Sequence, residues 1–342
     1  MRSLLIALAV TLLIGALAAF LTVRWAFSPV SATSDPVEFE VMPGWGAARV
    51  AAELEEHDLI RFASLFTAYL RFENLDRSIG EGLYDLDRSS SVPEIARRLA
   101  QGGRPRVVEL VVPEGVRAVD IAQRLGSSEL GTVEEFEELI GQPGELRPEY
   151  VPEGATLEGY LFPASYEFPV HESPEQVLRR MIERFEQELD EELLARVDEA
   201  GFSIHEWVTL ASLIQSEAGS DQEMPYIAGV FLNRLDVGMP LQSDPTVAYG
   251  LGKRMPELDA VAGDMQRDHE WNTYTRGGMP KGPISNPGRE ALHAALNPIR
   301  ADDDGREYFY FLHGRENGEP LLRLNFDLEG HNRDIDTYLR GN

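Results

Sequence analysis

The stretch WVTLASLIQSEAG, residues 207–219, predicts a short helix around which the rest of the chain is organised. Its apolar residues recur at helical spacing and form one face that points to a core: Val208, Leu210, Ala211, Leu213 and Ile214. Glu217 follows Ile214 by three positions and therefore projects from that same face. Burial there disfavours the charged carboxylate and raises its pKa, so the side chain can stay protonated near neutral pH. The alternative is a glutamate at a fraying helix end that simply reaches solvent.

The residues on either side of this stretch give Glu217 a defined place. Ser203 and Glu206 form a capping-box sequence that opens the helix, which explains Glu206 structurally but leaves Glu217 unexplained. Ser220 and Glu223 predict a second capping box, which starts another helix that runs to Gly238. Glu217 is therefore expected at a corner between two helices, where a side chain can be held in place and still face a groove.

Polar and aromatic loops follow the helix and suit a hydroxyl-rich ligand, because such ligands need planar polar groups beside aromatic rings. They lie in PLQSDPTVAYGLG (residues 240–252), NTY (272–274) and GPISNPG (282–288). The preceding stretch LEGYLFPASYEFP (157–169) reads either as a packing loop or as the wall of a cleft. The candidate ligand-binding residues are Gln242, Ser243, Asp244, Thr246, Asn272, Tyr274, Asn286 and Glu158.

The remaining patterns predict a mixed α+β fold. A long charged helix is expected from Ser173-Pro174 to about Ala200, and a shorter one from Arg289 to Leu296. Two strands within 308–326 predict a β-hairpin around Asn317-Gly318, with Asn325 facing the groove. A turn and a helix then close the chain over 327–339.

Composition excludes several classes of function. The net charge of -27 argues against nucleic-acid binding, because the phosphate backbone would be repelled. Cysteine is absent, which removes thiol nucleophiles and cysteine zinc sites. The histidines lack metal-ligand spacing, and no phosphate-binding or dinucleotide fingerprint occurs. We therefore expect neither a metal nor a cofactor.

An apolar run from Leu4 to Val23 is long enough to cross a bilayer as a helix. Arg2 and the amino terminus precede it, and the next basic residue after Arg24 is Arg49, which places the N-terminus in the cytoplasm. We interpret residues 1–27 as a cytoplasmic tip and single-pass anchor in the inner (cytoplasmic) membrane, residues 28–36 as a linker, and the bulk as periplasmic. A cleaved signal peptide is the alternative, since Ala16-Leu17-Ala18 resembles a cleavage site.

Residues 37–145 contain three similar units, each an extended stretch, a turn and an amphipathic helix. The first and third align with one insertion, VMPGWGAARVAAEL against VVPEGVRAVDIAQRL. Such modules resemble the LysM-like subdomain, which binds wall polysaccharide; a plain α+β scaffold is the alternative. A Pro/Gly-rich stretch at 141–154 marks the expected boundary with a catalytic domain at 146–342.

Residues 210–219 together with NRL (233–235), LQSDPTVAYG (241–250), WNTY (271–274) and GPISNPG (282–288) resemble the endolytic murein transglycosylase family (YceG-like, MltG type). The resemblance implies a lytic transglycosylase that cuts peptidoglycan glycan strands between N-acetylmuramic acid and N-acetylglucosamine. It also implies that Glu217 is the catalytic acid and that peptidoglycan synthases are partners. Two departures stand out: Gln215 where many relatives carry an acid, and Lys281 where proline is usual.

In the expected mechanism, Glu217 protonates the glycosidic oxygen and then removes the proton from the 6-hydroxyl of the muramic acid, which leaves a 1,6-anhydro end. Two alternatives stay open. One is a muramidase that uses water, and the other is a noncatalytic wall-binding assembly protein.

Overall fold

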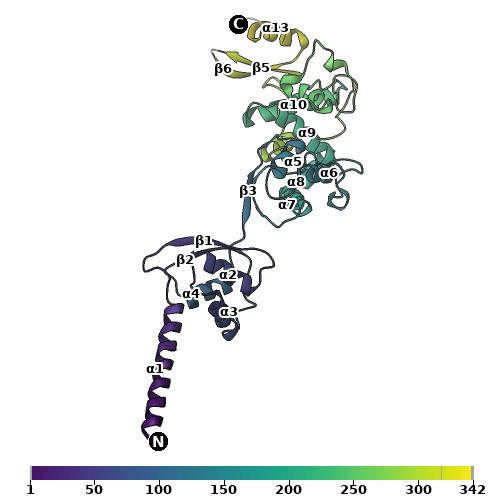
Figure 1. The fold of residues 1–342 in the computed structure, drawn as a ribbon. Coiled ribbons are helices and arrows are strands. Elements are labelled where there is room, and N and C mark those ends of the chain that lie inside the picture. The colour runs from purple at the N-terminus through teal and green to yellow at the C-terminus, as the bar shows by residue number, and fades with distance from the viewer. Residues whose placement is uncertain (1, 317, 340–342) are drawn as a thin grey trace. The chain divides into compact units, whose positions relative to one another are not determined.

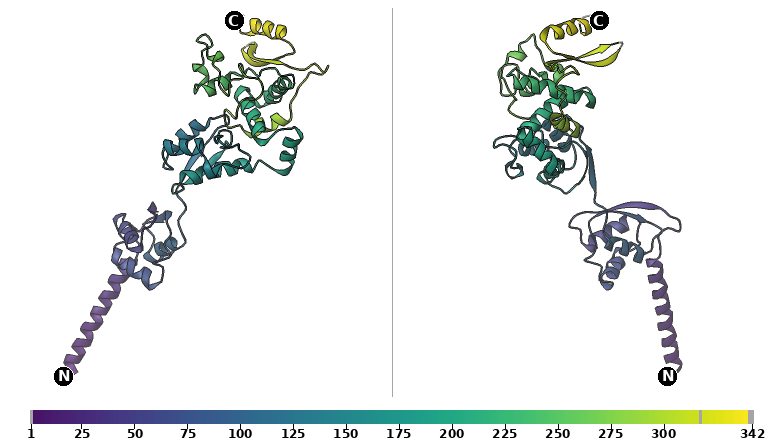
Figure 2. Two further views of the ribbon diagram at one scale, coloured as in Figure 1. Left: turned by 90° about the vertical axis from the view of Figure 1, so that its right-hand side faces the viewer. Right: turned by 180° about the vertical axis from the view of Figure 1, so that it is seen from behind.

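The computed structural model describes residues 2–316 and 318–339, which form a mixed α+β fold as expected. The chain divides into two compact units, Met1–Val107 and Val108–Asn342. Figure 1 labels elements of both units where there is room, and Figure 2 shows the ribbon from two further sides. Each unit is described by itself below.

The first unit joins one long helix to a small α+β core. Its elements are α1 (Arg2–Phe27), β1 (Pro36–Val41), α2 (Ala47–Glu56), α3 (Ala63–Phe72), β2 (Gly82–Asp87) and α4 (Val92–Ala100). Strands β1 and β2 pair antiparallel and set Phe39 opposite Tyr84. Both rings are buried against the apolar faces of α2, α3 and α4, which supply residues such as Leu54, Phe66 and Ile95. The alternating pattern of β1 and the 3.6-residue pattern of the helices thus meet in one core.

Helix α1 is long and apolar enough to cross a membrane over Val10–Phe27. Residues 28–36, expected to be a linker that lifts the rest of the chain off the bilayer, are hydrogen-bonded to other residues of the first unit. Arg61 donates hydrogen bonds to the carbonyl oxygens of Ser28 and Pro29. The Asp35 N–H donates to the carboxylate of Asp87 at 3.0 Å. These contacts hold the segment because its polar groups find partners in Arg61, just before α3, and in Asp87 of β2 rather than in water.

The second unit opens with a layer that supports the site. Its elements are β3 (Val107–Val111), α5 (Ala118–Gly126), α6 (Val133–Gly141), the 3₁₀ turn Gly144–Leu146, β4 (Ser165–Pro169), α7 (Pro174–Glu186) and α8 (Glu191–Glu199). Strands β3 and β4 pair, and their apolar residues share a core with α5, α6 and α7.

The long helix expected over 174–200 is wrong. It is broken between Glu186 and Glu191, where Asp190 accepts a hydrogen bond from the Leu193 N–H and starts α8 anew. A side chain that caps a new helix competes with continuation of the old one.

Helix α9 (Ile204–Glu217) forms the centre of the second core. The Ser203–Glu206 capping box is confirmed, and the apolar face is buried as expected. Burial extends to every residue from Trp207 to Ile214, so α9 is surrounded rather than one-sided. Helices α10 (Met224–Asp236) and α12 (Arg289–Leu296) pack on it, and the Trp207 indole donates to the Leu292 carbonyl at 2.9 Å.

The second expected capping box is wrong. Residues Asp221–Glu223 form a 3₁₀ turn, Ser220 makes no side-chain cap, and α10 begins at Met224. The turn between α9 and α10 is therefore closed by other contacts, which are described below.

The rest of the second unit surrounds the end of α9. A short helix, α11 (Asp244–Gly250), forms in the stretch that the sequence marked only as polar and loop-like. The 3₁₀ turns Met255–Glu257 and Asp264–Gln266 follow. Strands β5 (Tyr310–Glu316) and β6 (Glu319–Asn325) form the expected antiparallel hairpin, and α13 (Leu328–Tyr338) packs on it, as Figure 2 shows in yellow. Asn317 of the expected turn lies outside the described residues.

The three expected strand-turn-helix units are present as β1–α2, β2–α4 and β3–α5. The first two lie in the first unit, and the third belongs to the second unit because β3 pairs with β4. The compact units therefore separate at 107/108, which differs from the boundary of 145/146 placed by composition. The LysM-like resemblance of this region stays a prediction.

Candidate active site

The carboxyl group of Glu217 lies where α9 ends. Helical hydrogen bonding stops at Ala218, whose backbone is extended at φ -70 and ψ 135. The helix is fully buried from Trp207 to Ile214, so its last turn emerges directly from the core. Glu217 itself is only partly buried. The sequence thus places an acid on the last turn of α9, where the helix leaves the core and reaches a surface.

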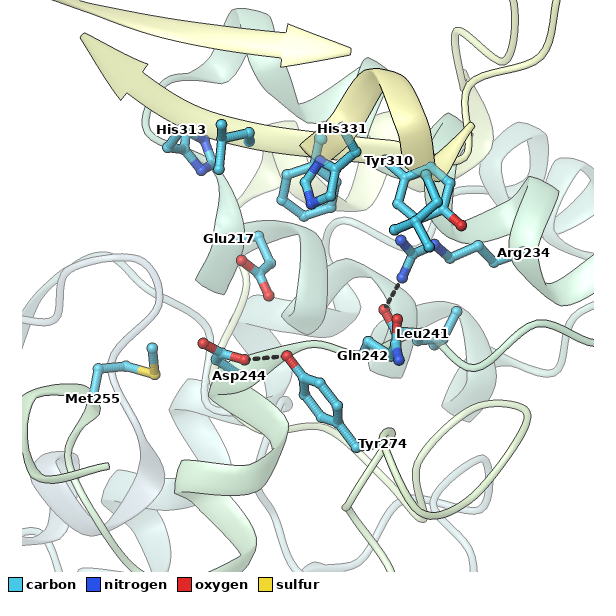
Figure 3. A pocket seen from close by; sticks show the side chains of 13 residues that line it. Glu217, Arg234, Leu241, Gln242, Asp244, Met255, Tyr274, Tyr310, His313 and His331 are labelled. Atoms are coloured by element: carbon cyan, nitrogen blue, oxygen red, sulfur yellow. Dashed lines mark hydrogen bonds between the residues drawn. The ribbon is translucent and has the colours of Figure 1, made fainter. Parts of the chain in front are cut away.

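A cavity of about 410 Å³ opens at this turn. One side, which we call the loop wall, consists of Leu241, Gln242, Asp244, Met255 and Tyr274. The other side, which we call the hairpin wall, consists of Tyr310, Phe311, Leu312, His313, Leu328 and His331. Figure 3 shows Glu217 pointing into the space between the two walls, with Arg234 at one end. The cavity is large enough to enclose part of a sugar chain and is open to solvent.

Glu217 is held by one short hydrogen bond. The Ser243 hydroxyl donates to Glu217 Oε1 at 2.6 Å. Burial raises the pKa of Glu217 to about 7, and the nearby charge of Asp244 adds to the rise. The Ser243 hydrogen bond and the positive charge of Arg234 act the other way, because both favour the carboxylate. The side chain can therefore both give and take a proton close to neutral pH.

Asp244 and Tyr274 form a second polar pair on the loop wall. The Tyr274 hydroxyl donates to Asp244 Oδ1, as the dashed line in Figure 3 marks. Burial raises the pKa of Tyr274 above its ordinary value, so this phenol stays a donor. Gln242 is exposed beside them and adopts a left-handed backbone with φ 52, which is uncommon for a residue with a Cβ. Of the eight expected ligand-binding residues, Gln242, Asp244 and Tyr274 line the cavity.

Ser243, Thr246 and Asn272 lie behind the loop wall and shape it. Thr246 donates to the Ser243 carbonyl at 2.6 Å, and the Ser243 N–H donates to the hydroxyl of Thr273. The Asn272 side chain accepts from the Tyr274 N–H at 2.8 Å and donates to the Arg267 carbonyl. All three residues are buried: Thr246 and Thr273 fix the backbone of Ser243, and Asn272 fixes that of Tyr274.

Glu158 and Asn286 lie away from the cavity and are bonded to each other. The Asn286 amide accepts from the N–H groups of Gly159 and Leu161 and donates to the Glu158 carboxyl at 3.0 Å. Glu158 also accepts from the Ala118 N–H at the start of α5. Burial raises the pKa of Glu158 to about 8. With these groups occupied internally, we assign both residues to the scaffold instead of to ligand binding.

Arg234 and the hairpin wall were missed as site residues. Arg234 is 6% exposed and donates to the carbonyls of Phe309 and Leu241, both at 2.7 Å. Its guanidinium lies 5.0 Å from the centre of the Tyr310 ring. Arg234 therefore ties both walls of the cavity to α10. The only signal for it in the sequence was its membership of the NRL motif.

The two residues that depart from the family pattern, Gln215 and Lys281, both have polar partners in the structure. Gln215 accepts a hydrogen bond from the Gly288 N–H at 2.9 Å, and it does not line the cavity. Lys281 pairs with Glu270 at 2.6 Å and lies over the Trp271 ring, also away from the cavity. Asn325, expected at the groove, donates to Asp334 on α13 instead. Among the described residues, no group of three or more His, Asp or Glu side chains could hold a metal ion.

The chain is similar to known proteins both in sequence and in structure. The model of the YceG-like family matches residues 39–337. An endolytic murein transglycosylase of Bacillus subtilis (strain 168) is 30% identical, over 94% of this chain and 90% of that protein. One from Streptococcus pneumoniae (strain D39) is 28% identical over 90% of this chain and 59% of that longer protein. The crystal structure of a putative yceG-like protein from Listeria monocytogenes superposes with a TM-score of 0.57 at 28% identity, covering 88% of this chain and 99% of that one.

Proposed function

The chain belongs to the YceG-like family, whose curated relatives are lytic transglycosylases, and from this premise we propose that it cuts peptidoglycan glycan strands internally. The proposed bond lies between N-acetylmuramic acid and N-acetylglucosamine, with Glu217 as acid and then base. The observation that carries the proposal is the Glu217 carboxyl, held by Ser243 between the two walls of a 410 Å³ cavity. Membership of an enzyme family disfavours the noncatalytic alternative.

The first step breaks the bond between C1 of the muramic acid and the glycosidic oxygen. Because Ser243 donates to Oε1 of Glu217, the proton of the neutral acid resides on the other oxygen, from which it passes to the leaving sugar. Positive charge then develops at C1. Asp244, fixed by Tyr274, supplies a negative charge within the same cavity and so stabilises that transition state.

The second step closes the ring. The 6-hydroxyl of the muramic acid attacks C1, and its proton returns to the Glu217 carboxylate. Ser243 and Arg234 stabilise the carboxylate between the two steps, since both favour the charged form. No water is consumed, and the product carries a 1,6-anhydro end. Gln242, exposed beside Asp244, is our candidate for orienting the sugar and its N-acetyl group.

A muramidase that uses water is the second candidate. The observation that favours it is the presence of Asp244 as a further carboxyl in the cavity, because hydrolases commonly use two. The two chemistries differ in their products. A hydrolase leaves a free reducing end and takes up one oxygen from water, whereas the transglycosylase leaves a 1,6-anhydro end.

The test is digestion of purified glycan strands by the full-length protein in water enriched in oxygen-18, followed by mass analysis. We expect anhydro ends without the isotope, and chain lengths that show internal cuts. Glu217→Gln should lower kcat by about 10² to 10⁴, the usual contribution of a general acid–base group, while the protein stays folded. Labelled reducing ends would establish the muramidase, and near-normal activity of Glu217→Gln would remove Glu217 from the mechanism.

We also propose that α1 anchors the chain in the inner (cytoplasmic) membrane with its N-terminus in the cytoplasm, and that peptidoglycan synthases are partners. Support comes from the apolar composition of α1 and from Arg2 at its first position. Protease treatment of intact spheroplasts should digest the second unit but spare a tag fused to the N-terminus. Digestion of that tag would reverse the assigned topology.

A further inference from the structure

The turn that follows Glu217 is closed by a carboxylate six positions further along the chain. After Ala218 the backbone leaves the helix, and the Gly219 N–H no longer has a helical partner. Glu223 supplies one, because its Oε2 accepts from the Gly219 N–H at 2.7 Å. The capping box expected between Ser220 and Glu223 is absent, since this carboxylate reaches back beyond Ser220 to the end of α9.

The same oxygen also contacts the opposite wall of the cavity. His313 Nε2 on β5 donates to Glu223 Oε2 at 3.2 Å. His313 belongs to the hairpin wall, and its ring meets that of Phe311 edge to face, with centres 5.9 Å apart. Phe311 in turn packs against Phe231 of α10. Figure 3 shows His313 and Glu217 on facing sides of one space.

One carboxylate therefore joins the end of the α9 helix to the hairpin wall. Its side chain is 17% exposed, against 38% for His313, so water competes little for the shared oxygen. A hydrogen bond from a backbone N–H to a carboxylate is among the stronger neutral-to-charged contacts in proteins. Loss of this contact would free the two residues after Glu217 and separate the turn from β5.

We propose that Glu223 is a positioning residue for the reaction. It holds the Gly219 N–H so that the Glu217 carboxyl faces the cavity, and through His313 it fixes the distance between the hairpin wall and Glu217. The proposal rests on the proposed function of Glu217 and adds a residue that does not itself touch the substrate.

The experiment compares Glu223→Ala, Glu223→Gln and Glu223→Asp in the full-length protein on purified glycan strands. Misplacement of a catalytic group by about 1 Å can cost up to about 100-fold in rate. We expect Glu223→Ala to lower kcat by about tenfold to about 100-fold, with KM changed by less than about threefold. Glu223→Gln should recover most of the rate, since its amide oxygen still accepts from Gly219. Glu223→Asp keeps the charge but is too short to reach the Gly219 N–H, so its kcat should fall as in the alanine variant. It serves as the test if the alanine variant folds poorly.

A matched control is Glu206, which lies at the N-terminal end of α9, opposite the end that Glu223 holds. Glu206 also accepts a backbone N–H, that of Ser203, at 2.9 Å. Glu206→Ala should lower the melting temperature but leave kcat unchanged. A further readout is the basic limb of the pH profile of kcat/KM: Glu223→Ala should move it to lower pH, because a loosened Glu217 is better hydrated, whereas Glu206→Ala should not move it.

The outcomes separate the two proposals. If Glu223→Ala, or Glu223→Asp where the alanine variant folds poorly, matches Glu206→Ala in kcat and pH profile, or if only KM rises, Glu223 is not a positioning residue. If Glu217→Gln retains near-normal activity, the proposed function itself fails, whatever the Glu223 variants do. Loss of kcat in the alanine and aspartate variants, with rescue by Glu223→Gln, supports the inference.

Discussion

Glu217→Gln should make the folded protein more stable than the wild type above pH 7, and this gain should vanish below about pH 4.5. Burial, the largest cause, raises the pKa of Glu217 from its ordinary 4.5 to about 7. A carboxyl whose folded pKa exceeds its unfolded pKa contributes stability that is complete below the unfolded value and lost as pH rises through the folded one. Glutamine carries no charge and therefore avoids that loss.

The size of the effect follows from the same pKa values. One pKa unit corresponds to about 1.4 kcal/mol, so a rise from 4.5 to about 7 sets an upper limit of roughly 3.5 kcal/mol of unfolding free energy. The true difference should fall below that limit, because Glu217 keeps partial access to solvent. The glutamine oxygen can still accept the Ser243 hydrogen bond, so the substitution leaves no buried hydroxyl without a partner.

The assay is urea unfolding of the full-length protein in detergent micelles from about pH 4 to about pH 9. Glu206→Gln is the control with the opposite sign. Hydrogen bonds from the Ser203 backbone and side chain lower the pKa of Glu206, so its contribution is present above pH 4.5 and lost as pH falls through its folded pKa. Parallel stability curves for wild type and Glu217→Gln would show that the acid is not desolvated, and would refute the reasoning.

Three further predictions concern the loop wall and the scaffold. Ser243→Ala should move the basic limb of the pH–activity profile upward by about one to two pH units, because a hydrogen bond to a charged group is worth about 1.5–3 kcal/mol; an unchanged limb would contradict the contact. Asn286→Ala should lower the unfolding free energy by about 3 kcal/mol or more, since two buried N–H groups lose their acceptor, and chemical denaturation measures this. Gln242→Gly should leave stability unchanged or slightly raised, because glycine suits φ 52, but should raise KM on glycan strands; an unchanged KM would remove Gln242 from substrate binding.

The sequence predicted the local features that depend on short spacing. The capping box of α9, its buried apolar face and the antiparallel hairpin all follow from residues within a few positions of each other. The same reasoning failed for Glu223, because a capping-box pattern does not reveal that the carboxylate has a better partner at Gly219. It failed also at Asp190, where one capping residue divides what periodicity reads as a single helix.

The walls of the cavity could not be predicted in this way. Ser243 meets Glu217 only because α10 reverses the chain and brings residues 26 positions apart into contact. Arg234 looks like an ordinary basic residue near a helix end, yet three-dimensional packing buries it against carbonyls of both walls. The histidines of the hairpin wall, His313 and His331, showed no ligand spacing, and only the placement of β5 and α13 brings them to the cavity.

Two glutamates of the second unit show why burial alone does not identify a catalytic acid. Burial raises the pKa of Glu158 to about 8 and that of Glu217 to about 7, so the pKa would favour Glu158 as the stronger candidate. Oε1 of Glu158 accepts from both the Ala118 N–H and the Asn286 amide, and the cavity that Glu158 lines has only about 70 Å³, which is far smaller than the cavity at Glu217. Glu217 has one such contact, from Ser243, and faces a cavity with a second carboxyl and aromatic rings. A raised pKa makes an acid available, and open space next to it decides whether a sugar can use it.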